Sequence, residues 1–414
     1  MMQPNNCVRI SKKSISMHSI CVFMVALYMM FLPFEYVITS ESGTISKYIG
    51  ILIIGLCFIN SPLSLRLNKN VILIACFLAY GVISCLWAIS PEYWNEVFLI
   101  YIKNAVLFFA ITQCRFTRKQ SDMVLNFYVF GAALLLIYLV TSSNTTVDPY
   151  SGRSVIMVND GYFDPNYMAA DIIVPMAYMY DMFYDNIIQK NLLKAMFVIV
   201  VLLALFYIVI LSGSRGGVLS IAGMIFTMTM LKMKDKAIRR KMLLIVMIGI
   251  VVLMVVVKMI PEQILKRFSL ASLSGMTDGG SGRLELWDAA WRGIKDNFIF
   301  GYGGGCAVPA VGKYHGVNRA AHSLFLSSHL EFGIISVLLY ISIYSEMRKA
   351  YQRKKYMEFS MLVGVLIASV FLDALTTKFF WTSLIILFTR NATGNKMIKA
   401  EETTENRIIP EGMN

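Results

Sequence analysis

The sequence predicts an all-α polytopic integral membrane protein with about 12 transmembrane helices and one large loop outside the cytoplasm. Three observations lead to this fold class. Hydrophobic residues make up 57% of the 414 residues and charged residues 15%, whereas a soluble domain carries about 25% charged residues. Mean hydropathy is +0.63. Apolar runs long enough to cross a bilayer recur along nearly the whole chain.

Each predicted span is an apolar run of about 17–25 residues. The runs are too continuous for barrel strands of alternating polarity, so we expect helices. The first run follows Arg9, Lys12 and Lys13 as a signal peptide would, but it lacks a small-residue cleavage site and is kept as a span. The predicted spans are 18–38, 45–61, 71–89, 95–113, 121–141, 165–184, 192–211, 216–231, 242–260, 323–345, 356–373 and 375–390.

The distribution of Lys and Arg predicts the orientation of these spans. With the N-terminus in the cytoplasm, every inner connection is basic, as the positive-inside rule requires. The short outer connections carry only Lys47, Arg153, Arg215 and Lys378. The net charge of +13 is therefore explained by membrane topology, and no nucleic-acid partner is expected.

The connection after the ninth span is unusually long, and long loops in compact proteins are commonly functional. Its second half has helical periodicity over 284–294, followed by the GYGGG run, which predicts a turn. The chain then divides into four segments. They are 1–260 with transmembrane helices 1–9 and the SGSRGG turn at 212–217, 261–322 with the extracytoplasmic catalytic loop, 323–390 with helices 10–12, and 391–414 with the cytoplasmic tail.

Arginines mark several helix boundaries on the predicted outer side. Arg215 lies among glycines where a helix begins, and backbone N–H groups at such a position suit an anion. Arg283 opens the loop helix, and Arg153 precedes the sixth span. A guanidinium pairs bidentately with phosphate and stays charged, so these arginines predict a pyrophosphate site. The alternative for a single one is an interfacial arginine that snorkels.

His322 stands at the outer entry of the tenth span, where an imidazole can act as a base near neutral pH. His315, His322 and His329 are seven residues apart, unlike helical zinc ligands, and no Cys or carboxylate cluster completes such a site, so no metal is expected. We assign His329 a structural role. A base among arginines, with no nucleotide motif, indicates transfer from an activated lipid-linked phosphate donor that needs no cofactor.

Five motifs follow one another along the chain, with the long outer loop among them. The motifs are LWAISP, FDPNYMAAD, SGSRGG, GRLELWDAAWRGIKDNFIFGYGGG and AHSLFLSSHLEFG. In their order and in the long outer loop, the chain resembles the O-antigen ligase and Wzy-type polysaccharide polymerase superfamily. This resemblance implies an enzyme of the bacterial cytoplasmic (inner) membrane with an extracytoplasmic active site. Such an enzyme moves a glycan from undecaprenyl pyrophosphate to a hydroxyl of a glycan or lipid acceptor, with inversion and without metal.

The resemblance also implies roles for individual residues. Arg215 and Arg283 hold the donor pyrophosphate, and His322 deprotonates the acceptor. The chain has His322-Ser323 where the family usually has His-Asn, a departure that bears on the assignment of the base. The substrate-binding residues are expected to be Arg153, Asp164, Asn166, His315 and Arg319.

Two alternatives stay open. Ligase and polymerase share these motifs and differ in the acceptor, and we favour a polymerase of a capsule or O-antigen-like glycan, with other polysaccharide-export proteins as candidate partners. The alternative from another class is a secondary transporter or a lipid-carrier or polysaccharide flippase, which needs ionisable residues along a path through the membrane. The main candidates for such a path are Lys103, Asp171, Asp181 and Asp373.

Overall fold

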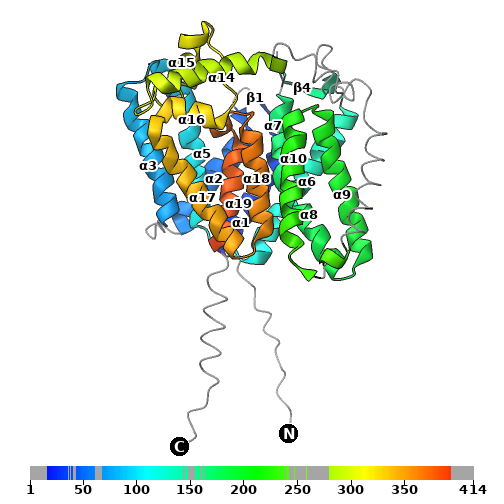
Figure 1. Cartoon of the computed structure of the whole chain (residues 1–414). Helices are drawn as coiled ribbons and strands as arrows, with labels where there is room; N and C mark the ends of the chain where they lie inside the picture. Colours follow the sequence, from blue (N-terminus) through cyan, green and yellow to red (C-terminus); the bar gives the residue numbers. More distant parts are fainter. Residues whose placement is uncertain are drawn as a thin grey trace, which may run out of the picture.

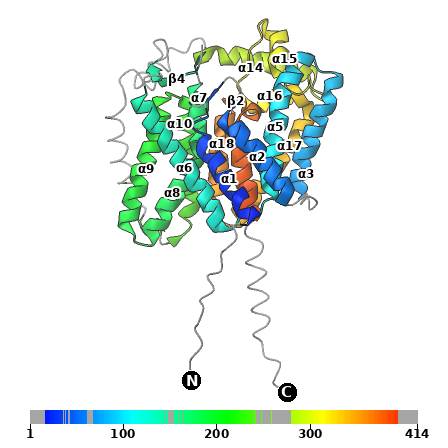
Figure 2. The ribbon, with the colours of Figure 1, turned by 180° about the vertical axis from the view of Figure 1, so that it is seen from behind.

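The helices stand side by side in a bundle, and α14 (Gly279–Asp296) lies across one end of it (Figure 1). At the opposite end α1 (Met17–Phe31) begins and α19 (Lys378–Ala392) ends (Figure 2). We call these the loop end and the terminal end. The computed structural model describes residues 16–35, 37, 39–40, 43–60, 68–142, 145–147, 154–158, 161–162, 164–236, 238–241, 247, 258 and 279–392.

The first part of the chain forms long apolar helices with polar residues at their beginnings. Asn68 caps α3 by accepting the N–H of Val71 at 3.0 Å, and Thr117 and Gln120 form a capping box at α6. The elements are α1, β1 (Thr39–Ser40), β2 (Gly43–Thr44), α2 (Ile45–Asn60), α3 (Lys69–Ile83), η1 (Ser84–Leu86), α4 (Pro91–Tyr93), η2 (Trp94–Phe98), α5 (Leu99–Gln113) and α6 (Arg118–Thr141).

A small antiparallel sheet of β3 (Thr145–Val147), β4 (Ser154–Val158) and β5 (Gly161–Tyr162) follows, with Thr145 paired to Ile156. The rest of the chain returns to helices. They are α7 (Pro165–Asp171), α8 (Ile173–Ile188), α9 (Leu192–Leu211), α10 (Arg215–Lys232), α14, α15 (Ala307–His315), α16 (Leu324–Phe332), η3 (Gly333–Ile335), α17 (Ser336–Gln352), α18 (Tyr356–Ser369), η4 (Ala374–Thr376) and α19.

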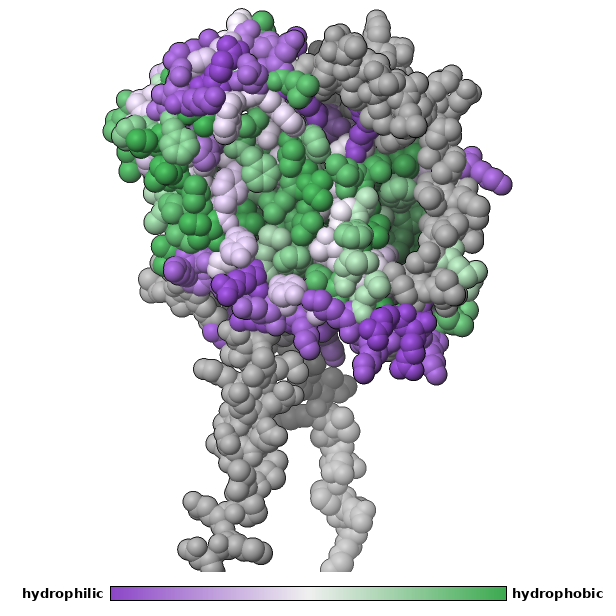
Figure 3. Space-filling view, viewed as in Figure 1, coloured by the Kyte–Doolittle hydropathy of each residue, from purple (hydrophilic) through white to green (hydrophobic). Residues whose placement is uncertain are grey.

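On the face that Figure 3 shows, an apolar belt lies between two polar ends of the bundle. Large hydrophobic side chains are exposed on the helices, including Phe58 at 71%, Leu193 at 82% and Phe226 at 65%. A soluble protein does not expose such a band, whereas lipid solvates it. Within the described residues five helical stretches are long and apolar enough to cross a membrane, namely Lys69–Leu86, Pro91–Gln113, Arg118–Thr141, Leu192–Leu211 and Leu324–Gln352. The chain is a multi-pass helical membrane protein.

The predicted spans coincide with described helices at all positions except 242–260, which lies outside the described residues apart from two positions. The helical prediction is confirmed, whereas the count of twelve spans stays a prediction. The short strands β1 to β5 were not expected, and all of them lie in connections between helices.

Two of the predicted spans are broken into shorter pieces. The span predicted over 165–184 is interrupted at Ile172, between α7 and α8. The span predicted over 323–345 is interrupted at Gly333, where φ is +53°. A Cβ at Gly333 would lie 2.3 Å from the carbonyl oxygen of Ile299, so a larger residue would push the chain before Tyr302 away from α16.

The segment after Gly279 is ordered and packs onto the loop end of the bundle. It has its own apolar cluster, in which Leu286, Ala290 and Ile294 of α14 lie against α15 and α16. The prediction that one apolar face of 284–294 is buried is only partly right, because the side chains of Leu284 and Trp291 are 61% and 52% exposed. The GYGGG run forms a buried turn. Its Gly303 N–H donates to the Glu331 carbonyl at 3.0 Å.

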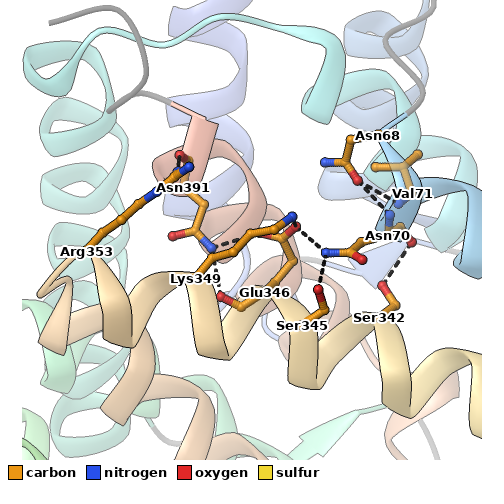
Figure 4. A network of polar contacts seen from close by, with 9 residues as sticks. All are labelled: Asn68, Asn70, Val71, Ser342, Ser345, Glu346, Lys349, Arg353 and Asn391. Atoms are coloured by element: carbon orange, nitrogen blue, oxygen red, sulfur yellow. Dashed lines mark hydrogen bonds and ion pairs between the residues drawn. The ribbon is translucent and has the colours of Figure 1, made fainter. Parts of the chain in front are cut away.

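A polar network at the terminal end joins α3, α17 and α19 (Figure 4). The Glu346 carboxylate is 2% exposed and accepts from Asn70 Nδ2 at 2.6 Å and from Asn391 Nδ2 at 2.8 Å. Lys349 Nζ lies 2.6 Å from the same carboxylate. A buried charge is tolerated only when it is paired and hydrogen-bonded, so this network fixes how the three helices meet.

Candidate active site at the loop end

Two helix N-termini meet at the loop end. Asp164 caps α7 by accepting the backbone N–H of Asn166 at 2.8 Å, and Ser214 caps α10 by accepting the N–H of Gly217 at 3.1 Å. The Asn166 side chain joins the caps, because Nδ2 donates to Asp164 at 2.8 Å and Oδ1 accepts from the Ser214 hydroxyl at 2.9 Å. The positive ends of two helix dipoles therefore lie together.

Glycine allows α10 to approach its neighbours. A Cβ at Gly217 would lie 2.6 Å from Ala169 Cβ of α7, and one at Gly216 would lie 3.3 Å from the Phe371 ring. The Gly217 N–H is already bonded to Ser214. The glycines of SGSRGG thus bring the helices together, in addition to any contact that their backbone makes with an anion.

Arg283 lies beside this pair of N-termini, at the beginning of α14. Its burial lowers the pKa of the guanidinium below its usual value; the nearby Asp164 and Asp373 carboxylates oppose this shift, and the neighbouring Arg215 adds to it. A lowered arginine pKa still leaves the group charged at neutral pH. Arg283 therefore lies in the electrostatic field of two carboxylates and a second arginine at the loop end.

A small cavity lies between α7, α10 and the end of α18. It is lined by Asn166, Ala170, Ser214, Gly216, Gly217, Arg283, Ala368, Phe371 and Leu372. Its volume is about 20 Å³, which holds about one water molecule. The cavity itself is too small for a diphosphate, so a phosphate donor has to meet Arg283 at the mouth of the cavity or separate its walls.

His322 lies directly before α16 and has a left-handed backbone with φ of +50°. Its backbone N–H donates to Asp373 Oδ2 at 3.2 Å, and its ring Nδ1 lies 3.7 Å from the same oxygen. The Ser327 hydroxyl donates to the other oxygen of that carboxylate at 2.5 Å. His tolerates this backbone region better than most residues, and unusual backbone of this kind is frequent at functional sites.

Asp373 was not predicted as a site residue. The sequence placed it at the end of the span 356–373 as an intramembrane ionisable group, whereas the structure places it after α18, against His322. The sequence feature that could have identified Asp373 as a site residue is its position as an acidic residue at the outer boundary of a span. Its carboxylate also raises the pKa of the Arg283 guanidinium, against the effect of burial.

Trp287 holds α14 over this group of residues. Its indole Nε1 donates to the Ala321 carbonyl at 2.9 Å, next to His322, and its ring stacks on Phe371 at 6.4 Å between centroids. The helix that carries Arg283 is therefore attached both to the segment that carries His322 and to the end of α18. This attachment restricts how Arg283 and His322, the two candidate side chains, can move relative to each other.

The other predicted substrate-binding residues are less closely associated with this group. His315 Nε2 lies 3.9 Å from Glu285 Oε2, a contact between α15 and α14. Arg319 is exposed on the segment before Ala321. Arg153 lies outside the described residues. His329 accepts or donates one hydrogen bond with Ser336 at 2.8 Å, which agrees with the structural role expected for it.

The comparisons with known proteins concern the same part of the chain. Residues 199–341 match the family model for O-antigen ligase, and no curated protein matches the chain. The matched segment begins in α9 and ends in α17, so it includes Arg215, Arg283 and His322. The resemblance to the O-antigen ligase and Wzy superfamily is therefore confirmed, and it rests on the segment that contributes both arginines and the histidine.

Proposed function

We propose that the chain is a membrane glycosyltransferase that moves a glycan from undecaprenyl pyrophosphate to an acceptor hydroxyl, with its loop end outside the bacterial cytoplasmic membrane. The family match supports membrane glycan transfer. The observation that carries the finer proposal is the contact of Asp373 with His322, at 3.7 Å, combined with the influence of the same carboxylate on Arg283. It joins a base and a phosphate-binding cation within one group of residues.

In this mechanism His322 is the general base. Because Nδ1 faces Asp373, the carboxylate favours the proton on Nδ1 and leaves Nε2 to take the proton of the acceptor hydroxyl. The acceptor oxygen then forms a bond with the anomeric carbon of the donor sugar. The bond from that carbon to the phosphate oxygen breaks on the opposite face, which inverts the configuration.

The leaving diphosphate takes the electron pair of the broken bond and gains negative charge. Arg215 and Arg283 stabilise it, together with the N-termini of α7 and α10. Asp164 and Asn166 keep the two N-termini together. In the proposed mechanism these groups supply the charge stabilisation without a metal ion or a nucleotide.

A transporter or flippase would instead need ionisable groups spaced along a path through the membrane. Asp181, one candidate for such a path, lies in the middle of α8 and is paired at 2.6 Å with Lys232, the last residue of α10. Asp373, a second candidate for such a path, lies against His322 at the loop end. Asp181 is paired with a lysine and Asp373 lies against His322, so neither is an unpaired charge along such a path, which favours an enzyme with its site on one face.

The test is complementation of a gene deletion, with the surface glycan analysed by gel and mass spectrometry. Arg215→Ala and Arg283→Ala are expected to reduce transfer about 100-fold or more, while the protein still inserts in the membrane. Arg292→Ala is the matched control, because Arg292 is exposed on α14 and pairs with Asp288. Full activity of Arg215→Ala would remove the phosphate-binding role.

The same deletion distinguishes the two acceptors. Single repeat units attached to their final carrier indicate a polymerase, whereas polymer that stays on the lipid donor indicates a ligase. Reporter fusions after Lys236 and Lys354 should report the cytoplasm, and a fusion near Met276 should report the outside. A cytoplasmic signal at Met276 would reverse the proposed orientation.

A further inference from the structure

Three cysteines from three different helices meet near the terminal end of the bundle. Cys21 lies one turn into α1, Cys57 near the end of α2, and Cys114 directly after α5. The sulfur–sulfur distances are 3.4 Å for Cys21 and Cys57, 3.6 Å for Cys21 and Cys114, and 3.3 Å for Cys57 and Cys114. The three Sγ atoms thus form a nearly equilateral triangle, which the spacing of these residues in the sequence does not indicate.

This triangle does not have the geometry of a disulfide, in which the two sulfurs are about 2.05 Å apart. All three cysteines are free thiols. Ordinary core packing explains why cysteines are buried, but it does not require three sulfurs from separate helices to converge on one point. Cys21 is fully buried, Cys57 is 7% exposed and Cys114 is half-buried, so the triangle is open to its surroundings only on the side of Cys114.

The distances fit three corners of a tetrahedral metal site. With Zn–S bonds of about 2.3 Å, the edge of a tetrahedron is about 3.8 Å. The observed edges of 3.3–3.6 Å reach that value with side-chain shifts of a few tenths of an ångström. Among the described residues this is the group of His, Cys, Asp and Glu side chains that has the spacing of metal ligands.

His18 lies three residues before Cys21 in α1, on the same side of the helix, since residues three apart are neighbours on a helix surface. It is half-buried but does not belong to the group of ligand atoms within 4.8 Å of one another, so its side chain has to change rotamer to supply the fourth ligand that a structural zinc site requires. Cys₃His is one of the common ligand sets of such sites.

We propose that Cys21, Cys57 and Cys114 bind a structural Zn²⁺ ion that fastens α1, α2 and α5 to one another, with His18 as the fourth ligand. Soft thiolate ligands favour zinc over magnesium or calcium. The site lies at the opposite end of the bundle from His322, so the ion takes no part in glycan transfer. The proposal does not depend on the proposed function.

The experiment measures the metal content of the full chain, purified in detergent under reducing conditions, by inductively coupled plasma mass spectrometry. We expect about one zinc per chain for the unchanged protein and less than about one-tenth for Cys57→Ser and Cys114→Ser. Cys76→Ser is the control, because Cys76 is an exposed thiol on α3 outside the triangle, and it should keep the zinc.

A second measurement uses the unchanged protein, so its result does not depend on whether the cysteine variants fold. After removal of the zinc, titration with Co²⁺ should give a thiolate-to-cobalt charge-transfer band that saturates at one equivalent and disappears when zinc is added. Unchanged protein that holds no zinc and gives no cobalt band would overturn the proposal. Zinc retained in Cys57→Ser, or a disulfide between two of the three cysteines in the unchanged protein, would also overturn it.

Discussion

The Asp373 carboxylate accepts the backbone N–H of His322 at 3.2 Å and lies 3.7 Å from the ring Nδ1 of the same residue. One side chain therefore bonds the backbone of the proposed base and lies beside its imidazole. Asp373 lies after α18 and His322 before α16, so the contact also fixes how these helices meet at the loop end.

Asp373→Asn should reduce the rate of glycan transfer about 100-fold or more, because an amide does not stabilise the imidazolium that forms when the base takes a proton. The amide oxygen can still accept the His322 N–H, so the fold should be preserved. The measurement is transfer by purified protein in detergent, with thermal unfolding as the check on folding. A variant that folds normally and transfers at the full rate would contradict the positioning role.

His322→Gly tests the base separately from the backbone. Glycine adopts the positive φ of this position without strain, so only the imidazole is removed. Transfer should be lost and should be partly restored by free imidazole in the assay. If imidazole has no effect on His322→Gly but restores an unrelated inactive variant such as Arg215→Ala, His322 is not the base.

Gly217→Ala should destabilise the protein by about 1–3 kcal/mol, because the added methyl group overlaps Ala169 at 2.6 Å. It should also lower transfer, since it pushes the N-termini of α7 and α10 apart. Gly55→Ala is the matched control, because a Cβ there meets nothing within 4 Å. Thermal unfolding in detergent compares the two, and equal melting temperatures would show that the contact of α7 with α10 is not close.

Glu346→Ala should destabilise the fold by about 3 kcal/mol, because it leaves the amides of Asn70 and Asn391 buried without their acceptor. Glu346→Gln should destabilise the fold less than Glu346→Ala, since its amide oxygen still accepts a hydrogen bond. Transfer activity of the folded fraction should be unchanged in both, because the network lies at the terminal end. A selective loss of activity with normal stability would indicate that the two ends of the bundle are coupled.

Many of the helices and helix caps of this protein can be predicted from short segments of the sequence. The apolar runs predicted helices at every described span, and the cap residues Asp164 and Ser214 lie where the motifs FDPNYMAAD and SGSRGG begin their helices. The loop helix was predicted as well, but its buried face was only partly right. At the end of a helix bundle, the neighbouring elements determine which side chains of a helix are buried. Leu286 is therefore buried and Leu284 is exposed.

The sequence by itself determined the membrane character and the helices, and it selected His322, Arg215 and Arg283 as candidate site residues, because hydrophobicity, charge and short motifs depend on residues close together in the chain. Only the tertiary structure decided that Asp373 lies against His322, that Asn166 joins two helix N-termini, and that Cys21, Cys57 and Cys114 meet. These contacts join residues 36 to 93 positions apart. Such pairings are set by the packing of helices against one another, for which a single sequence contains no periodic signal.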